Sequence, residues 1–300
     1  MRQRVITGVI FAIAVAGLYI PSLFLPDLIL LLALPVGIIG TYELIIAFRA
    51  GGFKPCVPLI IAGEAIGLVI YIVSRFLAFD LSRVLAFFLL LILSFCLACV
   101  ILVPVVRQNE FADADDGKGG VGNTFVDGSV TAGIILYIAF PLFCLISCIG
   151  FGQNGWYYML LGMCSSWMSD VFAYFAGVTL GKHKIVPHIS PKKSWEGCIG
   201  GVIGCAVIVA VYSDLVIYDL DKPAIGIVGF TVLTFIFGMF LSVVSQLGDW
   251  LASVIKRRVG IKDYGNIFPG HGGMMDRFDS TFFTIPVGCL LALTISVFLK

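Results

Sequence analysis

Residues 245–280 form a polar segment in a chain that is otherwise mostly apolar. The segment combines aspartates, basic side chains, one histidine and a glycine-rich run at residues 269–273. Its aspartates and basic residues are Asp249, Asp263, Asp276, Asp279, Lys256, Arg257, Arg258, Lys262 and Arg277. Carboxylates can hold a hard cation, basic groups can neutralise phosphate oxygens, and glycines let backbone N–H groups approach an anion closely. This combination indicates a site for a magnesium-bound polyphosphate.

A second group of candidate residues lies upstream of this segment. Asp170 follows Ser169 near the middle of a long apolar run, where an ionised carboxylate is costly unless it faces a polar cavity or a cation. We therefore expect Asp170 to belong to a site, with a structural hydrogen bond as the alternative. Residues 181–196 add a basic loop that contains Lys192 and Lys193. Such a loop can set membrane orientation or contact anionic lipid, but beside the segment 245–280 it favours anion binding.

The composition places these residues in a membrane protein. The chain has 300 residues, of which 60% are hydrophobic and 12% are charged, whereas soluble domains carry about 25% charged residues. Its mean hydropathy is +1.07. The apolar runs are too long for strands and use most of the chain, which leaves no room for a separate soluble domain. A net charge of +1 argues against binding to nucleic acid, because acidic residues balance the basic ones.

The sequence predicts an all-α, polytopic integral membrane protein with about nine transmembrane helices, each near the ~20 residues that cross a bilayer. The predicted spans are 5–25, 27–48, 57–79, 84–106, 129–149, 157–180, 197–218, 225–247 and 281–299. Residues 1–128 would form an N-terminal transmembrane region with about four of these spans. Residues 129–300 would form a C-terminal catalytic region with about five spans and the loops 181–196 and 248–280.

The distribution of basic residues predicts the orientation of these spans. The predicted loops fall into two sets, and the set that contains residues 181–196 and 248–280 carries 15 of the 19 Lys and Arg residues. Cytoplasmic loops carry the excess of Lys and Arg, so both polar loops are expected in the cytoplasm. Without the nine basic residues of those two loops, which a substrate could require, the ratio is 6 to 4. We expect a multi-pass protein of the cell inner (plasma) membrane, with its active site facing the cytoplasm.

Other polar or small residues lie within the apolar runs. Glu43 and Glu64 lie in or beside the second and third spans, where buried acids suggest a functional role, with an inter-helix hydrogen bond as the alternative. Nine cysteines are scattered along the chain, and the pair Cys96-x-x-Cys99 has no second pair or nearby histidine. We therefore expect these thiols to pack as small hydrophobes. Four glycines within residues 197–204 permit close helix packing.

A long motif of mixed residue types covers residues 253–279. It reads S-x-I-K-R-x4-K-D-x-G-x2-F-P-x-H-G-G-M-x-D-R-F-D. Together with Ser169-Asp170 and the run SPKKSWEG at residues 190–197, this motif resembles that of the phosphatidate cytidylyltransferases, also called CDP-diglyceride synthases. Because the motif is long and chemically mixed, a chance match is very improbable.

The resemblance covers residues from about 165 to 280, and the region before them resembles the family only as a run of helices. One position departs from the pattern, because the family often has Glu-Ser where this chain has Ala252-Ser253. If that glutamate serves catalysis or metal binding, its role is dispensable here or is filled by another acid.

The resemblance implies a membrane-embedded enzyme that condenses CTP with phosphatidate to give CDP-diacylglycerol and pyrophosphate. It also implies a homodimer and a two-metal centre in which Asp249 and Asp276 hold magnesium, with potassium as the second cation. The attacking phosphate monoester is already anionic near neutral pH. The protein would therefore position the substrates and neutralise charge, and it would not need a strong base.

The resemblance and the residue chemistry together assign roles to the remaining candidates. The residues expected to be catalytic are Asp170, Lys193, Lys262, Asp263, His271 and Arg277. Those expected to bind substrate are Ser169, Lys192, Lys256, Arg257, Gly272 and Gly273. The basic side chains would neutralise the phosphates of CTP or of the lipid, and Asp263 and Asp279 would hold those cations in place. His271 would donate a hydrogen bond to a phosphate.

Two alternative functions stay open from the sequence. A CTP-dependent kinase of a lipid alcohol would need a general base for the hydroxyl, which would promote His271 or Asp263. An ion-coupled secondary transporter, from a different functional class, would also have many spans and intramembrane acids such as Asp170 and Glu64. A transporter would not require so dense a metal-and-phosphate motif in one loop. A product that contains CMP joined to lipid would distinguish the transferase from the kinase.

Overall fold

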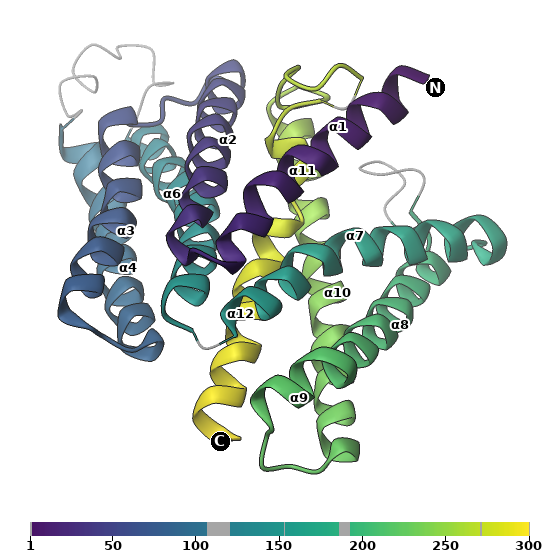
Figure 1. The fold of residues 1–300 in the computed structure, drawn as a ribbon. Helices are drawn as coiled ribbons and strands as arrows, with labels where there is room; N and C mark the ends of the chain where they lie inside the picture. The colour runs from purple at the N-terminus through teal and green to yellow at the C-terminus, as the bar shows by residue number, and fades with distance from the viewer. Residues whose placement is uncertain (1, 107–120, 153, 186–192, 271, 300) are drawn as a thin grey trace.

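The computed structural model describes residues 2–106, 121–152, 154–185, 193–270 and 272–299, and these residues form a bundle of helices (Figure 1). Within these ranges no residue lies in a β-strand, which confirms the predicted all-α class. The long helices are α1 (Arg2–Tyr19), α2 (Leu30–Ala50), α3 (Val57–Leu77), α4 (Leu81–Val106), α6 (Val121–Phe151), α7 (Gly155–Leu180), α8 (Trp195–Tyr212), α10 (Ile227–Arg258) and α12 (Thr281–Phe298). Short helical elements lie between them, namely η1 (Ile20–Leu23), η2 (Pro26–Ile29), η3 (Ser213–Ile217), α9 (Tyr218–Asp221) and α11 (Met275–Phe278).

Seven helical segments among the described residues are long and apolar enough to cross a membrane. They are Pro26–Ala50, Val57–Leu77, Leu81–Val106, Thr124–Gly150, Trp195–Asp221, Ile227–Arg258 and Thr281–Phe298. Each overlaps one of the predicted spans. Many of their large apolar side chains are exposed, including Phe76 at 85% and Leu90 at 71%, as expected for surfaces that face lipid. The chain is therefore a multi-pass membrane protein.

The predicted count of nine spans is not confirmed. Residues 5–25 and 157–180 do not form helices that are both as long and as apolar as the other seven. The segment Thr7–Leu23 is apolar but shorter than the others. Helix α7 is long, but three serines and Asp170 lower its hydropathy. In Figure 1 this helix runs obliquely across α10 and α12, and it contacts both.

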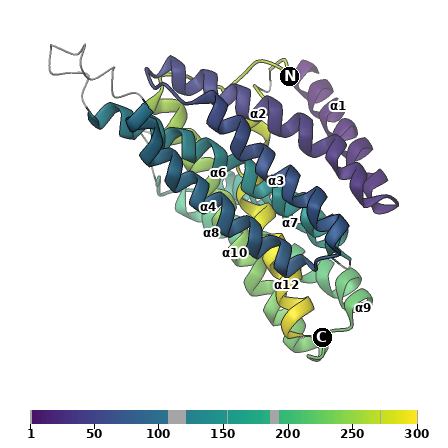
Figure 2. The same cartoon turned by 90° about the vertical axis from the view of Figure 1, so that its left-hand side faces the viewer.

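The long helices pack in two groups that meet along α6 and α12 (Figures 1 and 2). One group contains α2, α3, α4 and α6, and the other contains α7, α8, α10 and α12. The proposed boundary at residue 128 falls inside α6, which contacts helices of both groups. The N-terminus and the C-terminus lie at opposite ends of the bundle in Figure 1.

Small residues and thiols fill the closest helix contacts. A Cβ atom at Gly200 or Gly204 of α8 would collide with Ala176 or Phe172 of α7, which confirms the predicted packing role of these glycines. All nine cysteines are free. Those of the pair at positions 96 and 99 are 5% and 1% exposed, so both thiols are packed in the helix bundle.

Helix α10 continues beyond the predicted end of its span and ends at Arg258. Residues 248–258, which the sequence predicts to be loop, are therefore helical. They contain no proline, and the helix ends just before Gly260, whose φ of 77° favours glycine. Asp249 and Lys256 are two helical turns apart, so they lie on the same face of one rigid helix.

Candidate active site

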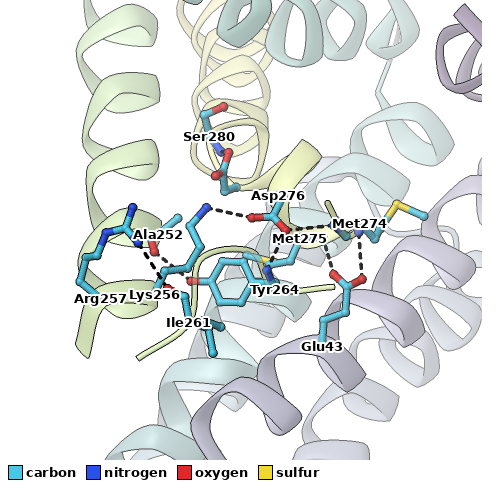
Figure 3. A network of polar contacts seen from close by, with 12 residues as sticks. Glu43, Ala252, Lys256, Arg257, Ile261, Tyr264, Met274, Met275, Asp276 and Ser280 are labelled. Atoms are coloured by element: carbon cyan, nitrogen blue, oxygen red, sulfur yellow. Dashed lines mark hydrogen bonds and ion pairs between the residues drawn. The ribbon is translucent and has the colours of Figure 1, made fainter. Parts of the chain in front are cut away.

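Asp276, in the short helix α11, is held by hydrogen bonds from several directions (Figure 3). Its Oδ1 accepts a hydrogen bond from Lys256 Nζ at 2.8 Å. Its Oδ2 accepts hydrogen bonds from the backbone N–H groups of Tyr264 at 2.7 Å and Gly273 at 2.9 Å. The Asp276 side chain is 4% exposed, and that of Lys256 is 13% exposed. These contacts fix the carboxylate between α10 and the loop that precedes α11.

Glu43 of α2 supports the same loop through a separate set of contacts (Figure 3). Its Oε1 accepts a hydrogen bond from the Met274 N–H at 3.0 Å, and its Oε2 accepts one from the Met275 N–H at 2.7 Å. Glu43 is 4% exposed. A Cβ atom at Gly265 or Gly273 would collide with the Glu43 carboxylate. The loop backbone therefore closes tightly around this side chain.

The two glutamates in apolar runs differ in what they bind. Glu64 of α3 accepts a hydrogen bond from the Thr41 hydroxyl of α2, which is the inter-helix bond that the sequence offers as an alternative. Glu43 instead binds the backbone directly before Asp276, at Met274 and at Met275, the first residue of α11. A functional role for Glu43 therefore stays a prediction.

Asp249, on α10, forms an ion pair with Lys193, which lies just before α8. The Lys193 Nζ also lies 5.4 Å from the ring centroid of Trp250, within the range of a cation–π contact. The side chains of the ion pair are 23% and 30% exposed. Each of the two aspartates expected to bind metal, Asp249 and Asp276, is therefore paired with a lysine.

A cavity of about 260 Å³ brings three of the predicted acids together. It is lined by Asp170 of α7, Asp276 of α11 and Asp279, which follows α11. Arg277 also lines this acidic cavity. Acidic residues that are distant in the sequence, on α7 and around α11, thus line one cavity, as expected for a site.

Helix α1 covers one side of the acidic cavity. Thr7 and Phe11 line it, and the Thr7 hydroxyl donates a hydrogen bond to the carbonyl oxygen of Pro269 at 3.2 Å. The Phe11 ring lies with its centroid 5.1 Å from that of Phe268 and 5.8 Å from that of Phe278. The sequence predicts residues 5–25 only as a membrane span, but this helix also contacts the motif.

A second cavity, of about 410 Å³, is lined by residues of α7, α8 and α10 and by the segment before α8. Its basic residues are Lys184 and Lys193, and Asp170 lines this basic cavity as well as the acidic one. Tyr174 and Val178 of α7 also line it, and they are 66% and 67% exposed. The basic cavity therefore combines cationic groups with an apolar wall on the outer face of α7.

Asp279 lies between α11 and α12 and is 8% exposed. Its Oδ1 accepts a hydrogen bond from the Ser280 N–H at 2.7 Å. Burial, followed by the charge of Asp249, raises the pKa of Asp279 to about 7. A cation placed in the acidic cavity would oppose both effects and favour the ionised carboxylate.

Ser169 and Arg257 make structural contacts outside the two cavities. The Ser169 hydroxyl is buried and hydrogen-bonded to the Ser242 hydroxyl at 2.7 Å, which joins α7 to α10. Arg257 is exposed, and its Nη1 donates a hydrogen bond to the carbonyl oxygen of Ile261 at 3.4 Å. Neither side chain lines the acidic or the basic cavity, so their expected substrate contacts stay predictions.

Four other predicted residues are not brought to these cavities by the structure. Lys262 and Asp263 are exposed on the loop after α10 and line neither cavity. Lys192 and His271 lie outside the described residues. Their expected roles in catalysis or binding therefore stay predictions.

Gly272 and Gly273 shape the loop around Asp276. Gly272 has a φ of 86°, and a Cβ atom there would lie 2.7 Å from the Asp276 Oδ2. Gly273 donates its N–H to the same oxygen. Both positions thus require glycine to hold Asp276, and a direct contact with substrate stays a prediction.

Position 252, where the chain departs from the pattern of the resembling family, is fully buried. Ala252 is 0% exposed, and its carbonyl oxygen accepts a hydrogen bond from the Tyr264 hydroxyl at 3.1 Å. Lys256 lies one turn further along α10 and bonds to Asp276. The acidic partner of Lys256 in this chain is thus Asp276 of α11, and position 252 of α10 supplies no carboxylate.

The oxygen donors around the acidic cavity suit magnesium, which prefers carboxylate ligands. No group of three or more metal-ligating side chains in the described part of the chain lies close enough to hold an ion. Magnesium usually binds through one or two carboxylates and completes its coordination with water and substrate phosphates. The carboxylates that line this cavity, Asp276 among them, fit such a shared ion, whereas Asp249 lines neither cavity and its role as a metal ligand stays a prediction.

Some contributors to the site have weak or no signals in the sequence. Glu43 is recognisable in the sequence as an acid in an apolar run, but the sequence does not reveal its hydrogen-bond partners. Thr7 and Phe11 have none, because their contacts depend on how α1 packs. Tyr264 occupies a variable position of the motif and acts through its backbone N–H.

Comparison with known proteins identifies the family of this chain. The sequence profile of the cytidylyltransferase family matches residues 2–295. A phosphatidate cytidylyltransferase from Bacillus subtilis is 32% identical over 289 residues, which cover 95% of this chain and 95% of the relative. One from Mycobacterium bovis is 29% identical over 281 residues, which cover 93% of this chain and 84% of the relative. One from Aquifex aeolicus is 39% identical over 152 residues, which cover 51% and 53%. The chain belongs to the cytidylyltransferase family.

Proposed function

We propose that this protein is a phosphatidate cytidylyltransferase, which joins CTP and phosphatidate to give CDP-diacylglycerol and pyrophosphate. The observation that carries the proposal is the pairing of Asp249 with Lys193 and of Asp276 with Lys256. One member of each pair lines a cavity, Lys193 the basic one and Asp276 the acidic one, and both cavities are also lined by Asp170. The family membership and the named relatives support the same reaction.

The two cavities suit the two substrates. The basic cavity offers Lys184 and Lys193 to a phosphate, while Tyr174 and Val178 offer an apolar wall to acyl chains. This is the combination that a lipid phosphate requires. The acidic cavity, with carboxylates and Arg277, suits a triphosphate bound with a cation. The shared residue Asp170 would then lie where the two substrates meet.

The chemistry requires charge neutralisation and alignment. A phosphate oxygen of phosphatidate attacks the α-phosphorus of CTP. The bond between the α-phosphorus and the oxygen that bridges the α- and β-phosphates breaks, and pyrophosphate leaves. Lys193 and Lys256 would transfer their hydrogen bonds from aspartates to phosphate oxygens as negative charge shifts to the leaving group. Magnesium, when bound at Asp249 and Asp276, would supply further neutralisation of the triphosphate. Potassium as a second cation and a homodimeric assembly stay predictions.

The proposal is tested with purified protein in detergent, phosphatidate, magnesium and CTP labelled at either the α- or the γ-phosphorus. We expect α-label, and no γ-label, to enter the lipid fraction. Asp276→Asn and Asp249→Asn should abolish the transfer. Asp80→Asn is the matched control, because Asp80 is an exposed aspartate between α3 and α4, paired with Arg83.

Each labelled position excludes a different function. Transfer of γ-label to a lipid alcohol would indicate a kinase and would contradict the proposal. An absence of label in lipid from either position would contradict enzymatic use of CTP on these lipids. Equal losses in the Asp80 and Asp276 variants would show that the effect is not specific to the site.

A further inference from the structure

Glu43 forms an unusual contact for a glutamate in a membrane-spanning helix. Both carboxylate oxygens accept hydrogen bonds from successive backbone N–H groups, those of Met274 and Met275. The two bonded residues directly precede Asp276. They are separated from Glu43 by more than 200 positions in the sequence, with the bond to Met275 spanning 232 residues.

The chemistry of this contact requires a carboxylate. Two backbone donors face one side chain, and a carboxylate offers one acceptor oxygen to each of them. A glutamine would present its amide NH₂ group to one of the two N–H donors, so that one bond would be lost. Within the described part of the chain, no Lys or Arg pairs with Glu43, and its recorded partners there are the two backbone N–H groups.

The surrounding structure keeps this contact rigid. Glycine at positions 265 and 273 leaves room for the carboxylate, since a Cβ atom at either position would collide with it. Met275 is fully buried, and its sulfur lies near Gly40 on the same helix α2. The same loop supplies two of the N–H groups that hold Asp276, from Tyr264 and Gly273. A displacement of the loop would therefore move these N–H groups away from Asp276.

We propose that Glu43 is a positioning residue for Asp276, which it aligns for cation and phosphate binding by clamping the backbone of residues 274–275. Its role in the reaction rests on the proposed function, but its role in holding the loop does not. Helix α2 thus belongs to the support of the active site and is more than a membrane anchor. Substitution of a residue that orients a metal ligand typically lowers metal affinity or activity by about 10- to 100-fold.

The test compares Glu43→Gln with wild type and with Glu64→Gln. Glu64 is a matched control, because it is another glutamate of an apolar helix, bonded to Thr41 of α2 and not to the loop. Glu43→Asp, whose shorter side chain reaches less far, should lie between wild type and Glu43→Gln. Gly265→Ala, which disturbs the carboxylate without changing α2, is a second variant in case Glu43→Gln does not fold.

The first readout is amide hydrogen exchange at residues 274–275 and does not depend on activity. We expect Glu43→Gln and Gly265→Ala to accelerate exchange there, while Glu64→Gln leaves it as in wild type. The second is the thermal stabilisation produced by magnesium with CTP, which should require a higher magnesium concentration only in the loop-disturbing variants. In the transfer assay, the apparent magnesium constant should rise by about 10- to 100-fold, while KM for phosphatidate stays unchanged.

The outcomes separate this inference from the proposed function. If wild-type protein transfers no label, the proposed function is wrong, but exchange and thermal stabilisation still decide the role of Glu43. If Glu43→Gln matches Glu64→Gln in exchange and in magnesium dependence, Glu43 does not position Asp276. If exchange accelerates but the magnesium dependence is unchanged, Glu43 supports the fold of the loop alone, which also overturns the inference.

Discussion

Lys256 and Asp276 form a buried ion pair between α10 and α11, with 2.8 Å between Nζ and Oδ1. The pair joins the C-terminal end of α10 to the short helix α11 near the end of the motif. Lys256 also lies over the Tyr264 ring, 5.2 Å from its centroid. The lysine therefore neutralises the aspartate in the absence of substrate and packs the loop that surrounds it.

Removal of this lysine should destabilise the protein. Lys256→Gln leaves the 4%-exposed Asp276 carboxylate without its cation, and loss of one partner of a buried pair costs about 3–5 kcal/mol. Arg83→Gln is the control, because Arg83 and Asp80 are 70% and 57% exposed and such pairs contribute about 0–1 kcal/mol. Denaturation in detergent measures both changes, and equal losses would argue against a buried, uncompensated charge.

Lys193 should compete with magnesium for Asp249 when no nucleotide is present. Lys193→Gln should therefore tighten magnesium binding to the nucleotide-free protein, as measured by calorimetry. The same change should raise KM for CTP or phosphatidate by roughly tenfold or more, since a hydrogen bond to a charged group contributes about 1.5–3 kcal/mol. Lys222→Gln, in the short turn before α10, is the control. Unchanged magnesium binding would mean that the ion pair does not occupy the metal position.

Gly273→Ala should reduce activity much more than Gly226→Ala. An added Cβ atom at position 273 collides with the Glu43 carboxylate and disturbs the N–H that binds Asp276. At position 226, which precedes α10, the same atom meets nothing within 4 Å. Initial rates of label transfer, normalised to folded protein, measure the difference. Similar rates for the two variants would show that the loop tolerates displacement.

The stability of the metal-free protein should fall as the pH rises from about 4 to about 7, because Asp279 has a pKa raised to about 7. In this window the folded protein holds a proton that the unfolded chain releases, so higher pH favours unfolding. Thermal denaturation with EDTA at several pH values tests this, with Asp279→Asn as the comparison. The variant should lose this part of the pH dependence, and an identical profile would contradict a raised pKa at Asp279.

Much of the architecture could be predicted from hydropathy and from the motif. Seven of the predicted spans correspond to long apolar helices, because a stretch of about 20 apolar residues has few stable alternatives in lipid. The motif indicated the family, and the resemblance to that family named Asp249 and Asp276 as metal ligands, which stays a prediction. The C-terminal end of α10 was predicted less well, because charged residues end a membrane span but do not end a helix. In the structure, α10 continues to Arg258.

The partners of the charged groups could not be predicted in the same way. Lys193 meets Asp249 across 56 positions, and Glu43 meets Met275 across 232, so neither contact follows from local spacing. The contact of α1 with the motif, through Phe11, likewise depends on how the helices pack. Hydropathy determines that a segment becomes a buried helix, but it carries no information on which face meets which neighbour. That choice depends on side-chain fit and hydrogen bonding between distant segments, which exist only in the folded chain.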